Sequence, residues 1–336
     1  MSRCFYKKIF LILFILMALG NSANANNLLT DNEISAINVL NGNYVCSIND
    51  AYQERYFKAN IIKNLNRDVG VIALGSSHLM TLSGEAVFGD YINLSLGGAS
   101  LQDRLNILGL LDLYNVKYKK IIYEMDITSF LDTARDEKPY NIDFNKYGDY
   151  FYKKLMNEDG YEKPSLDFND SYTNAFSDVP EWNLLNVYNE KNLPYGMVYY
   201  APDAAQGYPK EVYSLELENT KNHQQGLIGS DKAVHDKHIF DESREITDAL
   251  MKYFYDNNIE VVIVAVPRSP FVYDGSSMST SEFILDINKL IYKYYTNYNV
   301  KCCGSFSPYD MNIVDTDYYD ALHLKPEVIN HLYIIK

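Results

Sequence analysis

The sequence predicts an α/β protein, a three-layer α/β/α sandwich with a mainly parallel five-stranded sheet and a large insertion. Apolar strand patterns alternate with amphipathic helix patterns, as they do in βαβ units. The strands are near-continuous apolar runs, which is typical of a parallel sheet covered by helices on both faces. The rhythm stops after residue 126 and returns at residue 241 of the 336-residue chain, which places one long insertion between two parts of one sheet.

The first part of the sheet follows a polar N-terminal helical segment at residues 26–68. Asn49-Asp50 would cap the helix that starts at Ala51, because short polar side chains accept hydrogen bonds from the first free amides of a helix. Three apolar strands and one helix with apolar residues at 3.6-residue spacing then follow: strands 69–74, 91–96 and 119–126, and helix 101–114.

The second part of the sheet repeats the pattern towards the C-terminus. Its β-branched run VVIVAVP indicates a buried strand, and Asp241 would cap the helix before it. Pro326 suits the first turn of a closing helix, where its missing N–H costs nothing. The expected elements are helices 241–258, 279–298 and 325–335 and strands 261–267 and 300–306.

The insertion, residues 127–240, is rich in Tyr, Asn, Asp and Pro and has few long apolar runs. A structureless loop of this length is improbable in a compact domain. It leaves the carboxyl end of the third strand, and open α/β sheets bind ligands at that edge. We therefore predict a compact insertion that acts as a lid or a substrate-recognition region.

Charge and the N-terminus restrict the partners and the location. The formal net charge is −14, which repels phosphate backbones and argues against nucleic acid as a partner. Residues 1–25 read as a signal peptide, with Arg3, Lys7 and Lys8 before an apolar stretch and an Ala23-Asn24-Ala25 cleavage site. We expect an exported protein, periplasmic or extracellular; the alternative is a retained membrane anchor.

Small, polar and ionisable residues follow each strand at its carboxyl end. These segments are Gly75-Ser76-Ser77-His78, Gly97-Gly98-Ala99-Ser100, Glu124-Met125-Asp126, Pro267-Arg268-Ser269 and the loop carrying Asp320 and His323. Parallel topology brings them to one edge of the sheet. A serine needs a base to become a nucleophile, a neutral imidazole is such a base, and a carboxylate fixes its tautomer. Asp320 and His323 are three residues apart, which suits one turn of helix.

These segments resemble the motif blocks of the SGNH (GDSL-type) hydrolases, whose sheet is of the flavodoxin-like type. GSS follows the first strand, NLSLGGAS follows the second, and DALH lies near the C-terminus. The resemblance covers about 69–126 and 241–336. It implies Ser77 as nucleophile, with Ser76 as a variable spacer, His323 as base and Asp320 as its orienter. It also implies an oxyanion hole at the backbone N–H groups of Ser77 and Gly98.

One block departs from that pattern. Where the family has G-x-N-D, this chain has YEMD, so that Met125 occupies the place of the oxyanion-binding Asn. A methionine cannot donate a hydrogen bond, and the loss of one donor costs about 10²–10³ in rate. Divergent branches resemble this chain more closely, namely the extracytoplasmic alginate and peptidoglycan O-acetyltransferases and the teichoic acid D-alanyl transfer protein.

The resemblance implies acetyl or other acyl transfer to, or hydrolysis from, an envelope or secreted polysaccharide. It implies a glycan substrate and a membrane acyltransferase as partner, and no cofactor. The alternative, which Met125 favours, is a catalytically weak SGNH-like carbohydrate-binding or assembly protein. The two differ in one distance: the enzyme requires the Ser77 hydroxyl to lie within about 5 Å of His323.

Three further residues have two readings each. His78 is either a polar cap or a substrate-binding residue, and it is too close to Ser77 in sequence to be its base. Asp126 either binds substrate or holds the loops at the sheet edge, and Arg268 either binds substrate or pairs with Asp126. No Cys and His spacing resembles a zinc site, so no metal is predicted.

Overall fold

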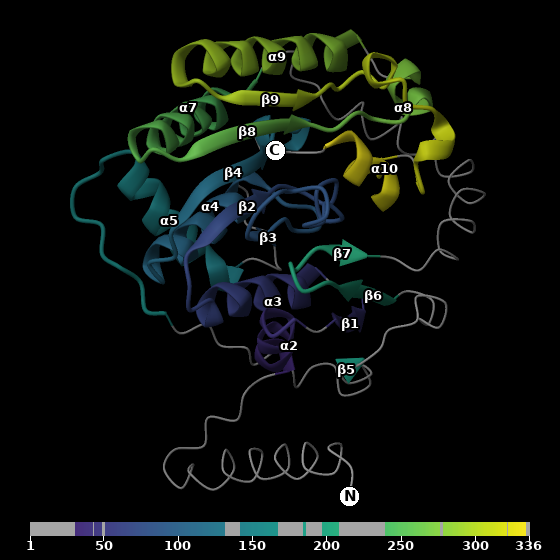
Figure 1. Ribbon diagram of the computed structural model, residues 1–336. Coiled ribbons are helices and arrows are strands. Elements are labelled where there is room, and N and C mark those ends of the chain that lie inside the picture. The colour runs from purple at the N-terminus through teal and green to yellow at the C-terminus, as the bar shows by residue number, and fades with distance from the viewer. Residues whose placement is uncertain are drawn as a thin grey trace, which may run out of the picture. The chain divides into compact units, whose positions relative to one another are not determined.

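The computed structural model has a five-stranded, all-parallel sheet in the order β3-β2-β4-β8-β9, within the three-layer α/β/α fold that the sequence predicts (Figure 1). The strands are β2 (Val69–Leu74), β3 (Tyr91–Asn93), β4 (Tyr118–Glu124), β8 (Glu260–Ala265) and β9 (Lys301–Gly304). The structure describes residues 31–42, 44–48, 51–131, 142–166, 184–185, 197–207, 239–275, 278–320 and 322–333. The predicted signal peptide and the predicted Asn49-Asp50 cap lie outside these residues.

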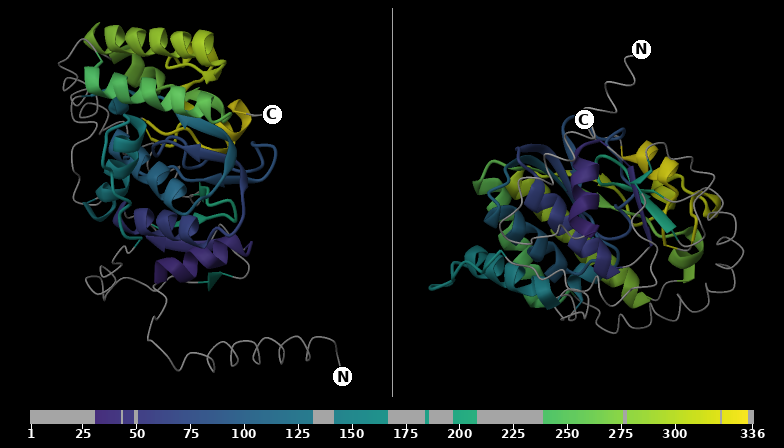
Figure 2. Two further views of the ribbon diagram at one scale, coloured as in Figure 1. Left: turned by 90° about the vertical axis from the view of Figure 1, so that its left-hand side faces the viewer. Right: turned by 90° about the horizontal axis from the view of Figure 1, so that it is seen from below.

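Both faces of this sheet are buried, because alternate strand residues belong to different hydrophobic clusters. Ile72 and Leu74 of β2 pack with the helices of one layer, whereas Val71 and Ala73 pack with the other. The helices of the first layer are α3 (Ala51–Asn64), α4 (Leu101–Leu113), α7 (Asp241–Asp256) and α9 (Met278–Tyr298), of which α7 and α9 lie side by side (Figure 2). The second layer consists of α10 (Pro326–Leu332) with segments 79–87 and 313–324.

We expected the N-terminal segment to be helical, but it also contains a strand. Between α2 (Asp31–Leu40) and α3 lies a strand, β1 (Tyr44–Ile48). It pairs antiparallel with β5 (Leu184–Leu185) and β6 (Met197–Tyr200), and β6 pairs with β7 (Gln206–Gly207). Its sequence YVCSI suits a strand, but its partners lie about 140 residues away, so that no local pattern announced the pairing.

The described parts of the insertion pack directly on the core. The 3-10 helix η1 (Ile127–Phe130) follows β4, and α5 (Ile142–Leu155) lies against α4. The contact is close, because a Cβ on Gly109 would collide with the backbone of Tyr147. The backbone N–H of Gln206 also donates to the carbonyl of Met80 at 2.7 Å, which joins β7 to the segment after Ser77. No helix in the described ranges is long and apolar enough to span a bilayer.

Two local details differ from the sequence prediction. The N-cap of α7 is Phe240, whose side chain makes no capping hydrogen bond, so Asp241 is the first helical residue and not the cap. Instead of capping the helix, the Asp241 carboxylate forms an ion pair with the Arg244 guanidinium, with 2.6 Å between Oδ1 and Nη2. The second detail is α8 (Pro270–Gly275), a short helix after β8 that the sequence did not predict. Beyond β9 the chain forms the 3-10 helices η5 (Tyr309–Met311) and η6 (Asp315–Asp317) and then α10, the predicted closing helix.

Candidate active site

The turn after β2 is shaped by the carboxylate at the end of the neighbouring strand. β2 and β4 are hydrogen-bonded neighbours, and Leu74 lies opposite Tyr123 in their register. A Cβ on Gly75 would lie 2.5 Å from Glu124 Oε2. Only a glycine leaves room there, and Glu124 accepts hydrogen bonds from both the backbone N–H and the hydroxyl of Ser76. Ser76 therefore anchors Glu124, a role that the motif did not predict.

Ser77, His323 and Asp320 form one hydrogen-bonded chain. Ser77 Oγ lies 2.7 Å from His323 Nε2, and His323 Nδ1 lies 2.6 Å from Asp320 Oδ2. Burial alone would raise the pKa of Asp320, but the hydrogen bond and charge of His323 and two backbone N–H groups hold that pKa below its ordinary value. Asp320 is thus a carboxylate that accepts from Nδ1–H, which leaves Nε2 to accept the proton of Ser77.

The segment that carries Asp320 and His323 is a tight loop and not the helical turn that their spacing suggested. Asp320 Oδ1 accepts from the backbone N–H groups of Leu322 and His323, both at 2.7 Å. The loop is closed by a bridge between Tyr318 and Leu324, and the Tyr319 ring stacks on the His323 ring at 5.4 Å with an interplanar angle of 11°. An Asp side chain that bonds backbone two or three residues ahead is typical of such turns.

A second histidine and carboxylate pair lies beside this chain. His78 Nδ1 is 2.9 Å from Glu124 Oε1 and 2.9 Å from Ser76 Oγ, and the His78 and His323 rings are 5.2 Å apart. Burial opposes charge on both groups. The mutual hydrogen bond and charge prevail, so the pKa of Glu124 falls to about 2 and that of His78 rises above its ordinary value.

Arg104 compensates the two carboxylates behind the Ser77 turn, and sequence reasoning missed it. Its guanidinium donates to the backbone carbonyl of Glu124, binds Asp126 Oδ2 at 2.8 Å and lies 3.9 Å from Glu124 Oε2. Its side chain is completely buried. A signal was present: Arg104 falls between Leu101, Leu105 and Leu108 on the apolar face of its helix, where a charge needs a partner.

Asp126 holds the loop after β4, as one of its two readings predicted. Its Oδ1 accepts from Ser129 N–H, Ser129 Oγ and Thr128 Oγ1, at 2.8, 2.6 and 3.0 Å. Its ion partner is Arg104. Arg268 is half-buried at the end of β8, close enough to His78 for its charge to lower the pKa of that imidazole.

Gly98 lies on a turn that α3 holds in place. The neighbouring Gly97 donates its N–H to Glu54 at 2.6 Å and accepts from Arg55 at 3.1 Å. Gly98 itself is exposed and has a φ of 59°, a left-handed backbone that glycine adopts without strain. In the described ranges, nothing accepts a hydrogen bond from the backbone N–H of Ser77 or Gly98, so both are available to a bound acyl group.

Asn93, the Asn of the NLSLGGAS segment, organises the chain after Ser77. Its side-chain amide donates to the carbonyls of Leu79, Met80 and Leu82 at 2.8, 3.2 and 2.9 Å. Lys58 of α3 donates to the Asn93 carbonyl at 2.7 Å and to that of Ala204 at 2.6 Å. Burial lowers the pKa of Lys58 to about 8. These bonds fix the nucleophile turn against α3 and the end of the insertion.

Met125 does not face the candidate site. Its side chain is fully buried in the hydrophobic cluster of the helical layer, and its backbone N–H donates to Val264 at 3.0 Å. The strand that provides an amide donor in the resembling family therefore offers none here.

Ligand atoms of His78, Glu124 and Asp126 lie within 4.8 Å of one another, a spacing that could hold a cation. The guanidinium of Arg104 and the imidazole of His78 already bind the two carboxylates. A divalent cation would compete with these two positive groups, so the donor set does not fit a resident metal.

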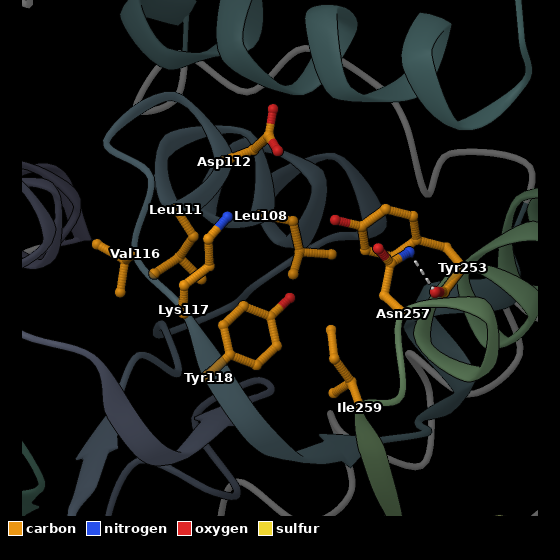
Figure 3. Close-up of a pocket in the computed structure, with 9 residues that line it drawn as sticks. All are labelled: Leu108, Leu111, Asp112, Val116, Lys117, Tyr118, Tyr253, Asn257 and Ile259. Atoms are coloured by element: carbon orange, nitrogen blue, oxygen red, sulfur yellow. Dashed lines mark hydrogen bonds between the residues drawn. The ribbon is translucent and has the colours of Figure 1, made fainter.

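A cavity of about 130 Å³ lies at the opposite edge of the sheet (Figure 3). Its lining includes Leu108, Asp112 and Tyr253, together with Tyr118, the first residue of β4. Ser77 follows the last residue of β2, and parallel strands place all carboxyl ends at the other edge. This cavity is therefore separate from the candidate site.

No family model matches the chain, and no curated protein matches it.

Proposed function

We propose that the protein is an exported, serine-dependent acyl-ester enzyme of the SGNH type. The observation that carries the proposal is the 2.7 Å separation of Ser77 Oγ and His323 Nε2, with Asp320 on the other nitrogen of the imidazole. This distance lies far inside the 5 Å limit set above. Three residues from two loops 243 positions apart meet in the order that acyl transfer needs.

The chemistry follows from this arrangement. Ser77 Oγ attacks the acyl carbonyl while His323 Nε2 takes the serine proton, and Asp320 stabilises the imidazolium that forms. The tetrahedral intermediate collapses, the C–O bond to the alcohol breaks, and His323 returns the proton to the leaving oxygen. Acyl-Ser77 remains, and a second hydroxyl, from water or a sugar, attacks it by the same steps in reverse.

The substrate proposal rests on the resemblance and on the predicted export. We propose acetyl or other acyl transfer to, or release from, an envelope or secreted polysaccharide, in the periplasm or outside the cell, without a cofactor. A membrane acyltransferase is the proposed partner for the transfer reaction. Esterase and transferase share the acyl-enzyme and differ only in the hydroxyl that reaches it.

The test is labelling by an active-site serine phosphonate together with turnover of 4-nitrophenyl acetate. We expect the wild-type protein to be labelled at Ser77 and to release acetate, and Ser77→Ala to do neither. Ser83→Ala is the matched control, since the Ser83 side chain lies outside the hydrogen-bonded chain and the bonds of Ser83 come from its backbone, whose N–H donates to Asn330 and whose carbonyl accepts from Ala86. Equal labelling of the wild type and Ser77→Ala would exclude the mechanism.

The burial of Met125 favours a second candidate, a catalytically weak glycan-binding or assembly protein that keeps the fold. The two proposals predict different results with a soluble acetylated polysaccharide. The enzyme binds it and releases acetate. The binding protein retains it on a column, and Ser77→Ala does so equally well, with no acetate released by either.

A further inference from the structure

The residues around Ser77 indicate which group could replace the missing oxyanion donor. Backbone N–H groups of Ser77 and Gly98 are two candidates. The third donor of the resembling family is absent because its place is taken by Met125, which cannot donate and lies in the core. A replacement must be a donor whose free N–H reaches the mouth of the site. His78 directly follows Ser77, and its side chain is 24% exposed.

The second ring nitrogen of His78 is the group that meets this need. Nδ1 is held by Glu124 and Ser76, and a carboxylate only accepts hydrogen bonds, so Nδ1 carries a proton. In the described chain, no group bonds Nε2 of His78. The centroid of the His78 ring lies 5.2 Å from that of the His323 ring, and His323 Nε2 contacts the nucleophile, so the two imidazoles border the same site.

We propose that His78 is a catalytic residue, which donates a hydrogen bond from Nε2–H to the acyl carbonyl oxygen as Ser77 attacks it. This role rests on the proposed function. Glu124 is then a positioning residue, which orients the ring through Nδ1. Glu124 is itself fixed by Ser76 and by Arg104. No proton is transferred by His78; the hydrogen bond shortens as negative charge develops on the oxygen.

The charge state of His78 suits this role. A neutral ring with its proton on Nδ1 could only accept at Nε2, whereas an imidazolium donates from both nitrogens. The groups that face the ring are Glu124, Asp126, Arg268 and the His323 ring. Of these, the two carboxylates raise the pKa of His78 and Arg268 lowers it, with a net rise. The donor form therefore persists to a higher pH than in an ordinary imidazole and is lost as the pH rises further.

Two amide variants separate donation from positioning, because each mimics one ring nitrogen. The Gln amide nitrogen overlaps Nε2, and the Asn amide nitrogen overlaps Nδ1. With 4-nitrophenyl acetate we expect His78→Asn to lower kcat by about 10²–10³ with little change in KM. We expect His78→Gln to keep most of kcat and to remove the alkaline limb of its pH profile. His331→Ala, an exposed histidine of α10, should match the wild type.

The opposite rescue, by Asn and not by Gln, would assign a structural role to the ring and overturn the proposal. Equal kcat in the wild type and His78→Asn, while Ser77 is labelled normally, would overturn it as well and leave the proposed function intact. Failure of the wild type itself to be labelled at Ser77 removes both.

If both amide variants unfold, the phosphonylated wild-type protein decides. A crystal structure of that adduct should place a phosphonyl oxygen about 3 Å from His78 Nε2. An adduct in which only backbone N–H groups reach that oxygen refutes the role of His78.

Discussion

The protein contains two histidine and carboxylate pairs whose imidazole ring centroids lie 5.2 Å apart. The two pairs are built in different ways. His323 and Asp320 lie three residues apart in one loop, half-buried, and Asp320 is held by the backbone of its own turn. His78 and Glu124 come from different strand ends, and Glu124 is completely buried with Arg104 behind it. We call them the loop pair and the strand pair.

The two pairs therefore differ in whether their charges change during the proposed reaction. In the proposed reaction the loop pair must carry a proton from Ser77 and return it, so its imidazole has to change charge. The strand pair keeps its charges, because a buried Glu124 without His78 and Arg104 would be costly. His323 of the loop pair therefore gains and loses a proton in the proposed reaction, whereas His78 of the strand pair keeps its charge.

Removal of the loop carboxylate should have the largest effect. Asp320→Asn leaves a side chain of the same shape but lets it donate to Nδ1, which favours the wrong tautomer of His323. We expect kcat for acetyl-ester turnover to fall by about 10⁴, with the fold unchanged by circular dichroism. Asp310→Asn is the matched control, an exposed carboxylate of the same C-terminal segment that binds Ser305. A loss below tenfold for Asp320→Asn would contradict the loop pair's role.

The strand pair should instead control stability. Arg104→Met leaves Glu124 and Asp126 without their common buried cation, and we expect the free energy of unfolding to fall by about 3–5 kcal/mol. Urea denaturation at pH 7 measures it. Arg244→Met removes an exposed ion pair with Asp241 and should cost no more than about 1 kcal/mol. Equal losses in the two variants would mean that the buried charges are not compensated by Arg104.

The strand pair also predicts a pH window for stability. Glu124 has a folded pKa of about 2 against an ordinary 4.5, so its contribution is complete above pH 4.5 and is lost as the pH falls towards 2. The shift corresponds to a contribution on the order of 3 kcal/mol. The raised pKa of His78 makes its share complete below about 6.5 and lost as the pH rises through the folded value.

Denaturation of the wild type and Glu124→Gln across pH 2–9 isolates this contribution, since other carboxylates titrate alike in both. We expect the difference in unfolding free energy to be largest between about pH 4.5 and 6.5. A difference that does not change with pH would show that Glu124 and His78 are not an ion pair.

The sequence predicted the sheet and the loop pair better than it predicted the strand pair. Apolar runs marked β2, β4 and β8, and the order of Ser77, Asp320 and His323 on strand ends brought them to one edge. The strand pair depends on Arg104 and on the close approach of Glu124 to Gly75. Those contacts depend on side-chain geometry across β2, β4 and α4, which residue spacing does not encode.

Strand β1 was missed for a related reason. A strand of five residues gains its hydrogen bonds from partners in the insertion, at 184–185 and 197–200. Its local sequence lies within a polar, helix-rich stretch, so the tertiary partners decide its conformation.

The smallest effect is expected from substitution of Tyr319, which tests how firmly His323 of the loop pair is held. Tyr319 stacks on His323 nearly parallel, and an aromatic contact of this kind contributes about 0.5–1.5 kcal/mol. If the stack keeps the imidazole aligned with Ser77, Tyr319→Leu should lower kcat by about 2- to 10-fold. Tyr319→Phe keeps the ring and should keep kcat. A similar loss in both variants would assign the effect to the tyrosine hydroxyl, and no loss in either would mean that Asp320 alone aligns His323.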